Sequence, residues 1–194
     1  LDRSRCVREI ERTLGESTPY ILFVGNIEPR KNLAFLVRAF EMVVTRVPEL
    51  KLIIAGRPGM PYPEFYKALS DSPMRKSITI VNGPSTEVLV QLYNAAACFC
   101  YPSLMEGFGL PVLEAFNCGC PVIASNNSSL PEVTGNAAVL LDATDLEGWV
   151  AAIEQFVKES AVADAYRVKG QERATLFSWE KCARQTVDVY RSLL

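Results

Sequence analysis

Two glutamates, Glu106 and Glu114, bracket the stretch of this sequence that is best suited to chemistry, and seven residues separate them. Between them, a Gly-Phe-Gly loop is followed closely by Pro111, and proline favours the first turn of a helix. We therefore expect a helix that begins near Leu110 or Pro111 and carries Glu114 about one turn inside it. The start of a helix presents unpaired N–H groups and the positive end of the helix dipole, which suits a phosphate.

The glutamates themselves suit hydroxyl groups, because a carboxylate accepts hydrogen bonds at two oxygens and can bind both hydroxyls of a vicinal diol. Glutamates on both sides of an anion-binding helix start fit a ligand with phosphates in the middle and a sugar at each side. That description matches a nucleotide sugar. In the alternative interpretation the loop is ordinary, Glu106 is a solvated charge, and Glu114 stabilises the helix start through its dipole. The spacing alone leaves both interpretations open.

The composition is that of an ordinary globular protein, with 194 residues, 49% hydrophobic and 22% charged. This length fits one domain. The net charge of −2 argues against a nucleic-acid partner. No apolar run approaches the roughly 20 residues that cross a bilayer, and the first residues do not resemble a signal peptide, so we expect a cytoplasmic location. The chain begins without Met, so we also expect it to be part of a longer protein.

The cysteines do not have the spacing of a metal site. Zinc ligands usually come as pairs separated by two or more residues and often include histidine, which this sequence lacks. We predict small buried thiols and no bound metal. The cysteines concerned are Cys6, Cys98, Cys100, Cys118, Cys120 and Cys182.

Short apolar runs that stop at or near glycine predict strands buried on both faces of a parallel sheet. The expected strands are 20–24, 50–55, 78–81, 98–101, 121–124 and 138–141. Helical periodicity predicts helices over 1–14, 33–47, 85–96 and 110–118, and a mostly helical chain from 146 onward. Asn32 and Ser85 are expected to cap two of the helix starts. Strands that alternate with helices indicate an α/β fold with a doubly wound, Rossmann-like parallel sheet of about six strands.

Gly25, Gly56 and Gly83 each follow one of these strands. Ligands of open α/β sheets bind along the carboxyl edge, so we expect these glycines and the loop at Gly107 to face one crevice. In the alternative interpretation they are turn glycines that serve only positive φ angles. Fixed cations near this edge would bind a diphosphate, and Arg30 and Lys31 are the candidates.

Several ordered motifs between about Tyr20 and Leu141 resemble the donor-site signature of glycosyltransferase family 4, the group 1 glycosyltransferases. The motifs are Gly25-Asn26-Ile27-Glu28-Pro29-Arg30-Lys31-Asn32, Tyr101-Pro102-Ser103, Glu106-Gly107-Phe108-Gly109-Leu110-Pro111, Glu114-Ala115, Gly119-Cys120-Pro121-Val122-Ile123-Ala124-Ser125 and Leu130-Pro131-Glu132-Val133. The resemblance implies the C-terminal, donor-binding half of a GT-B fold. Residues 1–18 would then be a leading helix and linker from a missing N-terminal acceptor domain. Residues 177–194 would be a C-terminal helix that crosses back toward that domain and is exposed without it.

The resemblance also assigns roles to residues. Glu106 would bind the transferred sugar and Glu114 the ribose hydroxyls, while Lys31 would hold the diphosphate. The family commonly has a basic residue where this sequence has Asn26, so Arg30 would supply that charge. The remaining donor-binding positions by resemblance would be Val81, Gly83, Pro84, Gly107, Phe108, Gly109 and Leu110. From their places after the first two strands, Gly25 and Arg57 would also reach the nucleotide.

By the same resemblance, the protein would be a retaining hexosyltransferase of polysaccharide biosynthesis, and it would need no cofactor or metal. The form of the motif after the first strand favours transfer of mannose from GDP-mannose, with other donors such as UDP-sugars open. The acceptor would be a glycan or a lipid-linked glycan, which would place the whole protein at the periphery of a membrane, and this chain alone would be inactive. Two alternatives remain: a nucleotide-binding module without catalysis, and half of a sugar-nucleotide epimerase.

Overall fold

The computed structural model describes residues 2–15 and 19–193, which form a six-stranded sheet in the order β3-β2-β1-β4-β5-β6. Every strand pair is parallel. The strands are β1 (Tyr20–Val24), β2 (Lys51–Ala55), β3 (Ile78–Val81), β4 (Cys98–Tyr101), β5 (Val122–Ser125) and β6 (Val139–Leu141). This order, with its reversal between β1 and β4, is that of a doubly wound sheet, so the predicted α/β fold is confirmed.

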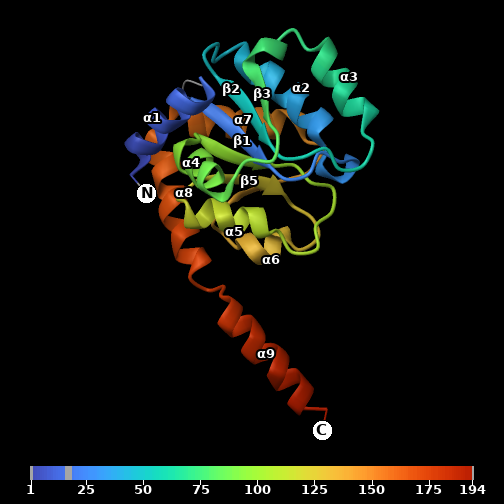
Figure 1. Ribbon diagram of the computed structural model, residues 1–194, viewed down its shortest axis with the longest axis vertical. Coiled ribbons are helices and arrows are strands. Elements are labelled where there is room, and N and C mark those ends of the chain that lie inside the picture. The colour runs from blue at the N-terminus through green and yellow to red at the C-terminus, as the bar shows by residue number, and fades with distance from the viewer. Residues whose placement is uncertain (1, 16–18, 194) are drawn as a thin grey trace.

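Helices cover both faces of the sheet (Figure 1). The helices are α1 (Arg3–Leu14), α2 (Leu33–Val44), α3 (Pro63–Asp71), α4 (Thr86–Ala95), α5 (Leu110–Asn117), α6 (Leu130–Thr134), α7 (Leu146–Lys158), α8 (Ser160–Ala174) and α9 (Trp179–Arg191), with short 3-10 turns η1 (Pro29–Lys31) and η2 (Arg75–Ser77). α2 packs against α3 and α7 on one face. On the other face α1 packs against α4, and α5 packs against α8.

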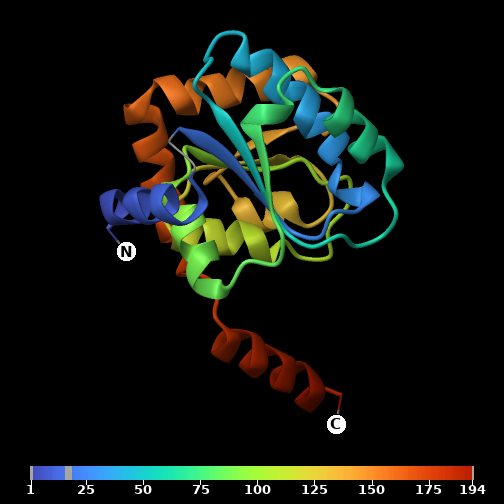
Figure 2. The same cartoon turned by 45° about the horizontal axis from the view of Figure 1, so that its top comes forward.

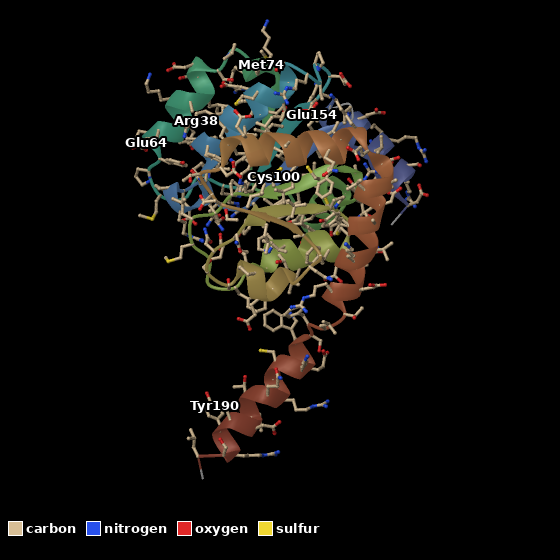
Figure 3. The ribbon with its side chains drawn as sticks, turned by 180° about the vertical axis from the view of Figure 1, so that it is seen from behind. Arg38, Glu64, Met74, Cys100, Glu154 and Tyr190 are labelled. Atoms are coloured by element: carbon tan, nitrogen blue, oxygen red, sulfur yellow. The ribbon has the colours of Figure 1, made fainter. Side chains whose placement is uncertain are left out.

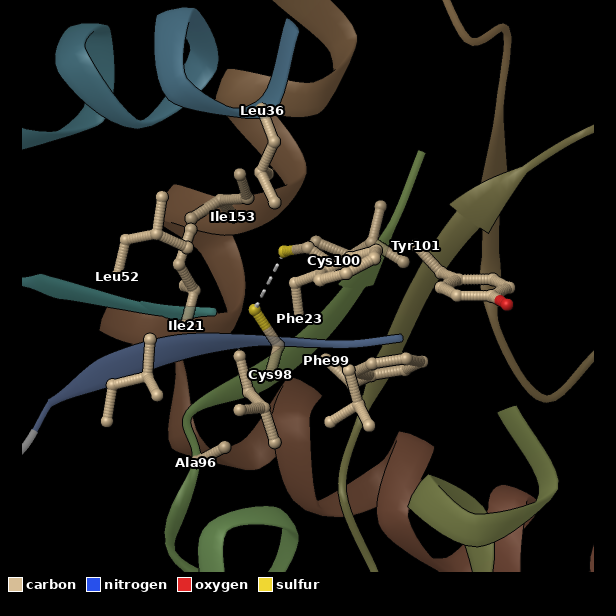
Figure 4. Packing of buried hydrophobic residues seen from close by; sticks show 14 of the residues in the cluster. Ile21, Phe23, Leu36, Leu52, Ala96, Cys98, Phe99, Cys100, Tyr101 and Ile153 are labelled. Carbon is tan, nitrogen blue, oxygen red and sulfur yellow. Dashed lines mark hydrogen bonds between the residues drawn. The ribbon is translucent and has the colours of Figure 1, made fainter. Parts of the chain in front are cut away.

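The central strands are apolar throughout because both of their faces are covered. All residues of β1 and β4 are buried. Figure 4 shows how β4 supplies small thiols and large rings to this core, with the thiols of Cys98 and Cys100 hydrogen-bonded at 3.9 Å. Most cysteines are buried or partly buried, as predicted, but Cys182 is exposed because it lies on α9. Among the described residues, no group of three or more Cys, Asp or Glu side chains could hold a metal ion.

The two predicted helix caps had different outcomes. Ser85 caps α4, because its hydroxyl accepts a hydrogen bond from the Val88 N–H. Asn32 stands at the N-cap position of α2, as predicted, but its side-chain amide donates to the Ala143 carbonyl at 3.0 Å and, within the described chain, makes no capping hydrogen bond. Asn32 has a φ of +57°, in the left-handed region that asparagine tolerates. A contact with a distant segment therefore replaces the local cap.

α9 extends away from the body of the molecule in both views of the ribbon (Figures 1 and 2). None of its described residues is buried, and Trp179 and Tyr190 are 75% and 66% exposed. Figure 3 shows Tyr190 on this projecting helix, well away from Glu154 on α7. The apolar side chains of this helix, such as Val187 and Val189, are thus exposed. Residues 1, 16–18 and 194, which the expected leading and C-terminal segments include, lie outside the described residues.

None of the helices in the described ranges combines the length and the apolar character that a membrane span requires.

Candidate functional site

A cavity of about 350 Å³ opens at the carboxyl ends of β1, β2 and β3. Its lining residues are Val24, Gly25, Asn26, Ala55, Gly56, Arg57, Gly83, Pro84 and Leu89. The crevice predicted at the three strand-ending glycines is therefore present. Gly107, which was expected to face the same crevice, is not among its lining residues, because its loop follows β4 on the other side of β1. A second cavity, of about 260 Å³, is lined by Arg5, Cys6, Glu9 and Gln91 of α1 and α4.

The glycines of the first cavity serve more than turn geometry. Gly83 has a φ of +59°, which suits glycine. Gly56 has no such angle, but a Cβ atom at this position would overlap the carbonyl oxygen of Gly25. Close approach of two backbones, rather than a turn, therefore requires glycine at Gly56. The result is an edge of bare backbone that a flat or charged ligand can approach.

Beside this edge, Glu106 lies between two cations. Lys31 Nζ donates to Glu106 Oε1 at 2.6 Å, and Arg30 Nη1 donates to Glu106 Oε2 at 2.9 Å. Lys31 also donates to the Tyr101 hydroxyl at 2.6 Å, and Arg30 lies 2.7 Å from a carboxylate oxygen of Glu28. The Lys31 side chain is only 5% exposed and that of Glu106 only 7%, so these two residues are not solvated loop charges.

Burial and hydrogen bonding set the ionisation of this cluster. Burial lowers the pKa of Lys31, and the hydrogen bond to Glu106 partly offsets the effect. Burial opposes the charged form of Glu106, but hydrogen bonds, above all from Lys31, outweigh it and keep the pKa of Glu106 below its ordinary value. Glu106 is therefore an ionised acceptor at neutral pH and not a general acid. A cation on each of its oxygens also makes it a weak nucleophile.

The loop that carries Glu106 is fixed from two neighbouring segments. On one side, the Leu104 N–H donates to the Arg30 carbonyl at 2.7 Å. On the other side, Ser128 accepts from the Glu106 N–H, and the Ser129 hydroxyl lies within hydrogen-bonding distance of the carbonyls of Glu106 and Phe108. Ser128 adopts a φ of +47°, a rare angle for serine that is typical of functional loops.

α5 begins at Leu110, as predicted, and carries Glu114 just after the loop that contains Glu106. Gly109 precedes the helix with a φ of +106°, and a Cβ there would come within 2.9 Å of Leu130 Cδ2. Because glycine has no side chain, it leaves the N–H groups of the first turn without a side-chain cap. Glu114 is exposed one turn further on, and its Oε2 accepts a hydrogen bond from the Tyr93 hydroxyl at 3.0 Å.

The structure thus brings the predicted site residues together in three adjoining places. Gly25, Asn26, Arg57, Gly83 and Pro84 line the cavity, and Val81 ends β3 just before it. Arg30, Lys31 and Glu106 form the charged cluster. Gly107, Phe108, Gly109, Leu110 and Glu114 form the loop and the start of α5, with Phe108 and Leu110 exposed.

Some contacts of these residues were not assigned from the sequence. Tyr101 and Glu28 stand inside the motifs that were noted, but no role was given to either. Tyr93 and Ser129 carry no local signal at all, because each acts on a residue more than 20 positions away: Tyr93 donates across 21 positions to Glu114, and Ser129 across 23 to Glu106.

A family model described as glycosyl transferases group 1 matches residues 8–173 of this chain. The chain belongs to the group 1 glycosyltransferases. It is 37% identical over 176 residues to the O-antigen chain mannosyltransferase B of Escherichia coli, covering 90% of this chain and 46% of that protein. The resemblance noted from the motifs is thereby confirmed.

Solved structures of other proteins share the fold. Sucrose-phosphate synthase of Thermosynechococcus elongatus is 28% identical, with a TM-score of 0.82 over 96% of this chain and 49% of that one. HepE of Anabaena, solved in complex with UDP and glucose, is 17% identical, with a TM-score of 0.87 over 99% of this chain and 53% of that one. This group 1 glycosyltransferase chain therefore spans about half the length of the proteins that it matches.

Proposed function

We propose that this chain is the donor-binding domain of a retaining glycosyltransferase that transfers mannose from GDP-mannose to a glycan or a lipid-linked glycan. One observation carries the proposal: an uncapped helix start stands between a glutamate clamped by two cations and a second, exposed glutamate. Phosphates suit the helix start and the cations, and hydroxyl groups suit the carboxylates.

The base, the ribose and the diphosphate of the donor nucleotide would each bind a different part of this site. The nucleoside base would lie in the cavity, against Gly83 and Pro84 and within reach of Arg57. The ribose hydroxyls would bind Glu114. The diphosphate would meet the N–H groups of Gly109 and Leu110 at the start of α5.

Lys31 and Arg30 would supply positive charge to the diphosphate. Lys31 has three N–H donors, two of which serve Tyr101 and Glu106, and the third would donate to a phosphate oxygen. Negative charge grows on the diphosphate as the bond to the anomeric carbon breaks. Cations that Glu106 already holds in place would therefore stabilise the transition state more than the ground state.

Glu106 would accept hydrogen bonds from the transferred sugar. Both of its oxygens already bind a cation, yet each carboxylate oxygen can accept more than one hydrogen bond, so Glu106 would still accept one from a sugar hydroxyl. Because Glu106 is not suited to act as a nucleophile, retention would follow a front-face route. In that route the leaving phosphate takes the proton of the acceptor hydroxyl.

The choice of mannose is supported by the E. coli mannosyltransferase relative. The choice of GDP rests on the form of the motif after β1. The UDP in the HepE complex keeps a UDP-sugar as the second candidate donor. Membership in a glycosyltransferase family favours transfer over the epimerase alternative. The acceptor domain would lie in the part of the protein outside this chain, and the enzyme would work in the cytoplasm, at the membrane periphery where its acceptor is lipid-linked.

Calorimetric titration of this chain with GDP, UDP, ADP, GDP-mannose and UDP-glucose tests the proposal. We expect one base to be preferred, with a dissociation constant between about 1 μM and 1 mM. Glu114→Ala should weaken that binding at least about tenfold, because two hydrogen bonds to a charged acceptor are lost. Glu172→Ala, which removes an exposed carboxylate on α8, is the matched control and should bind like the native chain. Absence of binding to all five compounds, or equal binding by Glu114→Ala, contradicts the proposal.

A further inference from the structure

Glu114 rests on a buried phenol. The Tyr93 hydroxyl, on α4, donates to Glu114 Oε2 at 3.0 Å, although the two residues lie on different helices. Tyr93 is only 2% exposed, whereas Glu114 is exposed to solvent. The contact therefore joins the protein interior to the outward-facing carboxylate that the proposed function assigns to the ribose.

The position of Tyr93 is fixed by ring packing and by a hydrogen bond to the adjacent backbone. Its ring meets Phe99 of β4 edge to face, with centroids 5.4 Å apart. Phe99 in turn stacks on Tyr101 with centroids 5.3 Å apart (Figure 4). The backbone beside Tyr93 is also held, because the buried Tyr20 hydroxyl donates to the Leu92 carbonyl at 2.7 Å. These contacts restrain the Tyr93 side chain in one position, in which its hydroxyl donates to Glu114.

This contact orients Glu114 without using up its capacity to bind a ligand. A carboxylate accepts about four hydrogen bonds, and Tyr93 supplies one of them, to Oε2. A glutamate that is already held loses less side-chain entropy on binding than one that moves freely. Burial, followed by the nearby Glu114 charge, raises the pKa of Tyr93 well above its ordinary value, so the hydroxyl keeps its proton and remains a donor.

We propose that Tyr93 is a positioning residue that holds Glu114 in the orientation which accepts the ribose hydroxyls of the donor nucleotide. The inference rests on the proposed function, and it adds a residue that the donor-site motif does not contain. It makes a specific prediction: loss of the Tyr93 hydroxyl should be felt only by ligands that carry ribose hydroxyls.

The test compares Tyr93→Phe with the native chain in calorimetric titrations with GDP and UDP, and with their 2′,3′-dideoxy counterparts. Phenylalanine keeps the ring that packs on Phe99 and removes only the hydroxyl. For the ribonucleotide that binds, we expect about 5- to 10-fold weaker binding by Tyr93→Phe. For the dideoxy counterpart, whose sugar has no hydroxyl for Glu114 to accept, we expect a change of less than about 2-fold.

Tyr62→Phe is the matched control, because it removes a buried tyrosine hydroxyl that accepts a hydrogen bond from the Ala34 N–H of α2, on the opposite face of the sheet from α4 and α5. It should weaken binding of both forms of the nucleotide by less than about 2-fold. The inference is overturned if Tyr93→Phe weakens both forms by the same factor, or if it leaves binding of the ribonucleotide unchanged. If the native chain binds neither GDP nor UDP, the proposed function itself fails.

Discussion

Replacing Lys31 by methionine is expected to abolish nucleotide binding and to lower the free energy of unfolding by about 2 to 3 kcal/mol. Methionine matches the length of lysine but removes its charge and its donors. Glu106 then keeps Arg30 but loses the hydrogen bond at 2.6 Å that offsets its burial. Removing one partner of a buried ion pair leaves the other charge buried with less compensation. The expected loss of unfolding free energy therefore exceeds that for a surface ion pair.

Urea denaturation and calorimetry measure the two effects separately. The double variant Lys31→Met/Glu106→Gln should regain part of the lost stability, because no buried charge is stranded, yet it should bind no nucleotide. Lys76→Met, at an exposed lysine, is the control and should stay within about 0.5 kcal/mol of the native chain. A Lys31→Met chain with native stability and native affinity would show that the cluster of Arg30, Lys31 and Glu106 contributes neither to folding stability nor to nucleotide binding.

The second large effect is expected at Gly56, where alanine should lower the free energy of unfolding by about 3 kcal/mol or more. The added Cβ would overlap the carbonyl oxygen of Gly25, and neither backbone can move without disturbing the pairing of β1 and β2. For a chain of this size, such a loss lowers Tm by roughly 6 to 12 °C. Thermal unfolding followed by circular dichroism measures the shift.

Gly107→Ala is the matched control for this experiment. A Cβ at Gly107 would meet no described atom within 4 Å, and Gly107 is not among the described glycines with positive φ. Its Tm should therefore change by less than about 2 °C. If Gly56→Ala were as stable as Gly107→Ala, the close approach of the Gly56 and Gly25 backbones would not be what requires glycine at position 56.

The fold followed closely from the sequence because its central strands are buried on both faces. Continuous apolar runs such as 20–24 and 98–101 coincide with β1 and β4 residue for residue. The start of α5 was also predictable, since proline in its first turn and a preceding glycine act locally. α3 was not anticipated, although Pro63 stands in its first turn. Asn32 is the N-cap residue of α2, as predicted, but its side chain makes a hydrogen bond to Ala143, 111 positions away, in place of a local capping bond.

The contacts of the site could not be read from local patterns. Lys31 and Glu106 are 75 positions apart, and they meet because β1 and β4 are neighbours in the sheet. The sequence identified both residues as candidates, with Lys31 assigned to the diphosphate and Glu106 to the sugar. It contained no sign that they pair with each other, that Lys31 donates to Tyr101, or that Tyr93 donates to Glu114. Those arrangements arise from topology, which brings distant loops to one edge.

The most direct measurement is a map of backbone amide chemical shifts for the ¹⁵N-labelled chain, titrated with the nucleotide that binds most tightly. The account predicts that the largest changes gather at the carboxyl edge, at Gly25, Gly56 and Gly83 in the cavity and at Leu110 at the start of α5. Changes centred instead on Arg5 and Gln91, in the cavity between α1 and α4, would contradict it. So would the absence of any localised change at saturating nucleotide.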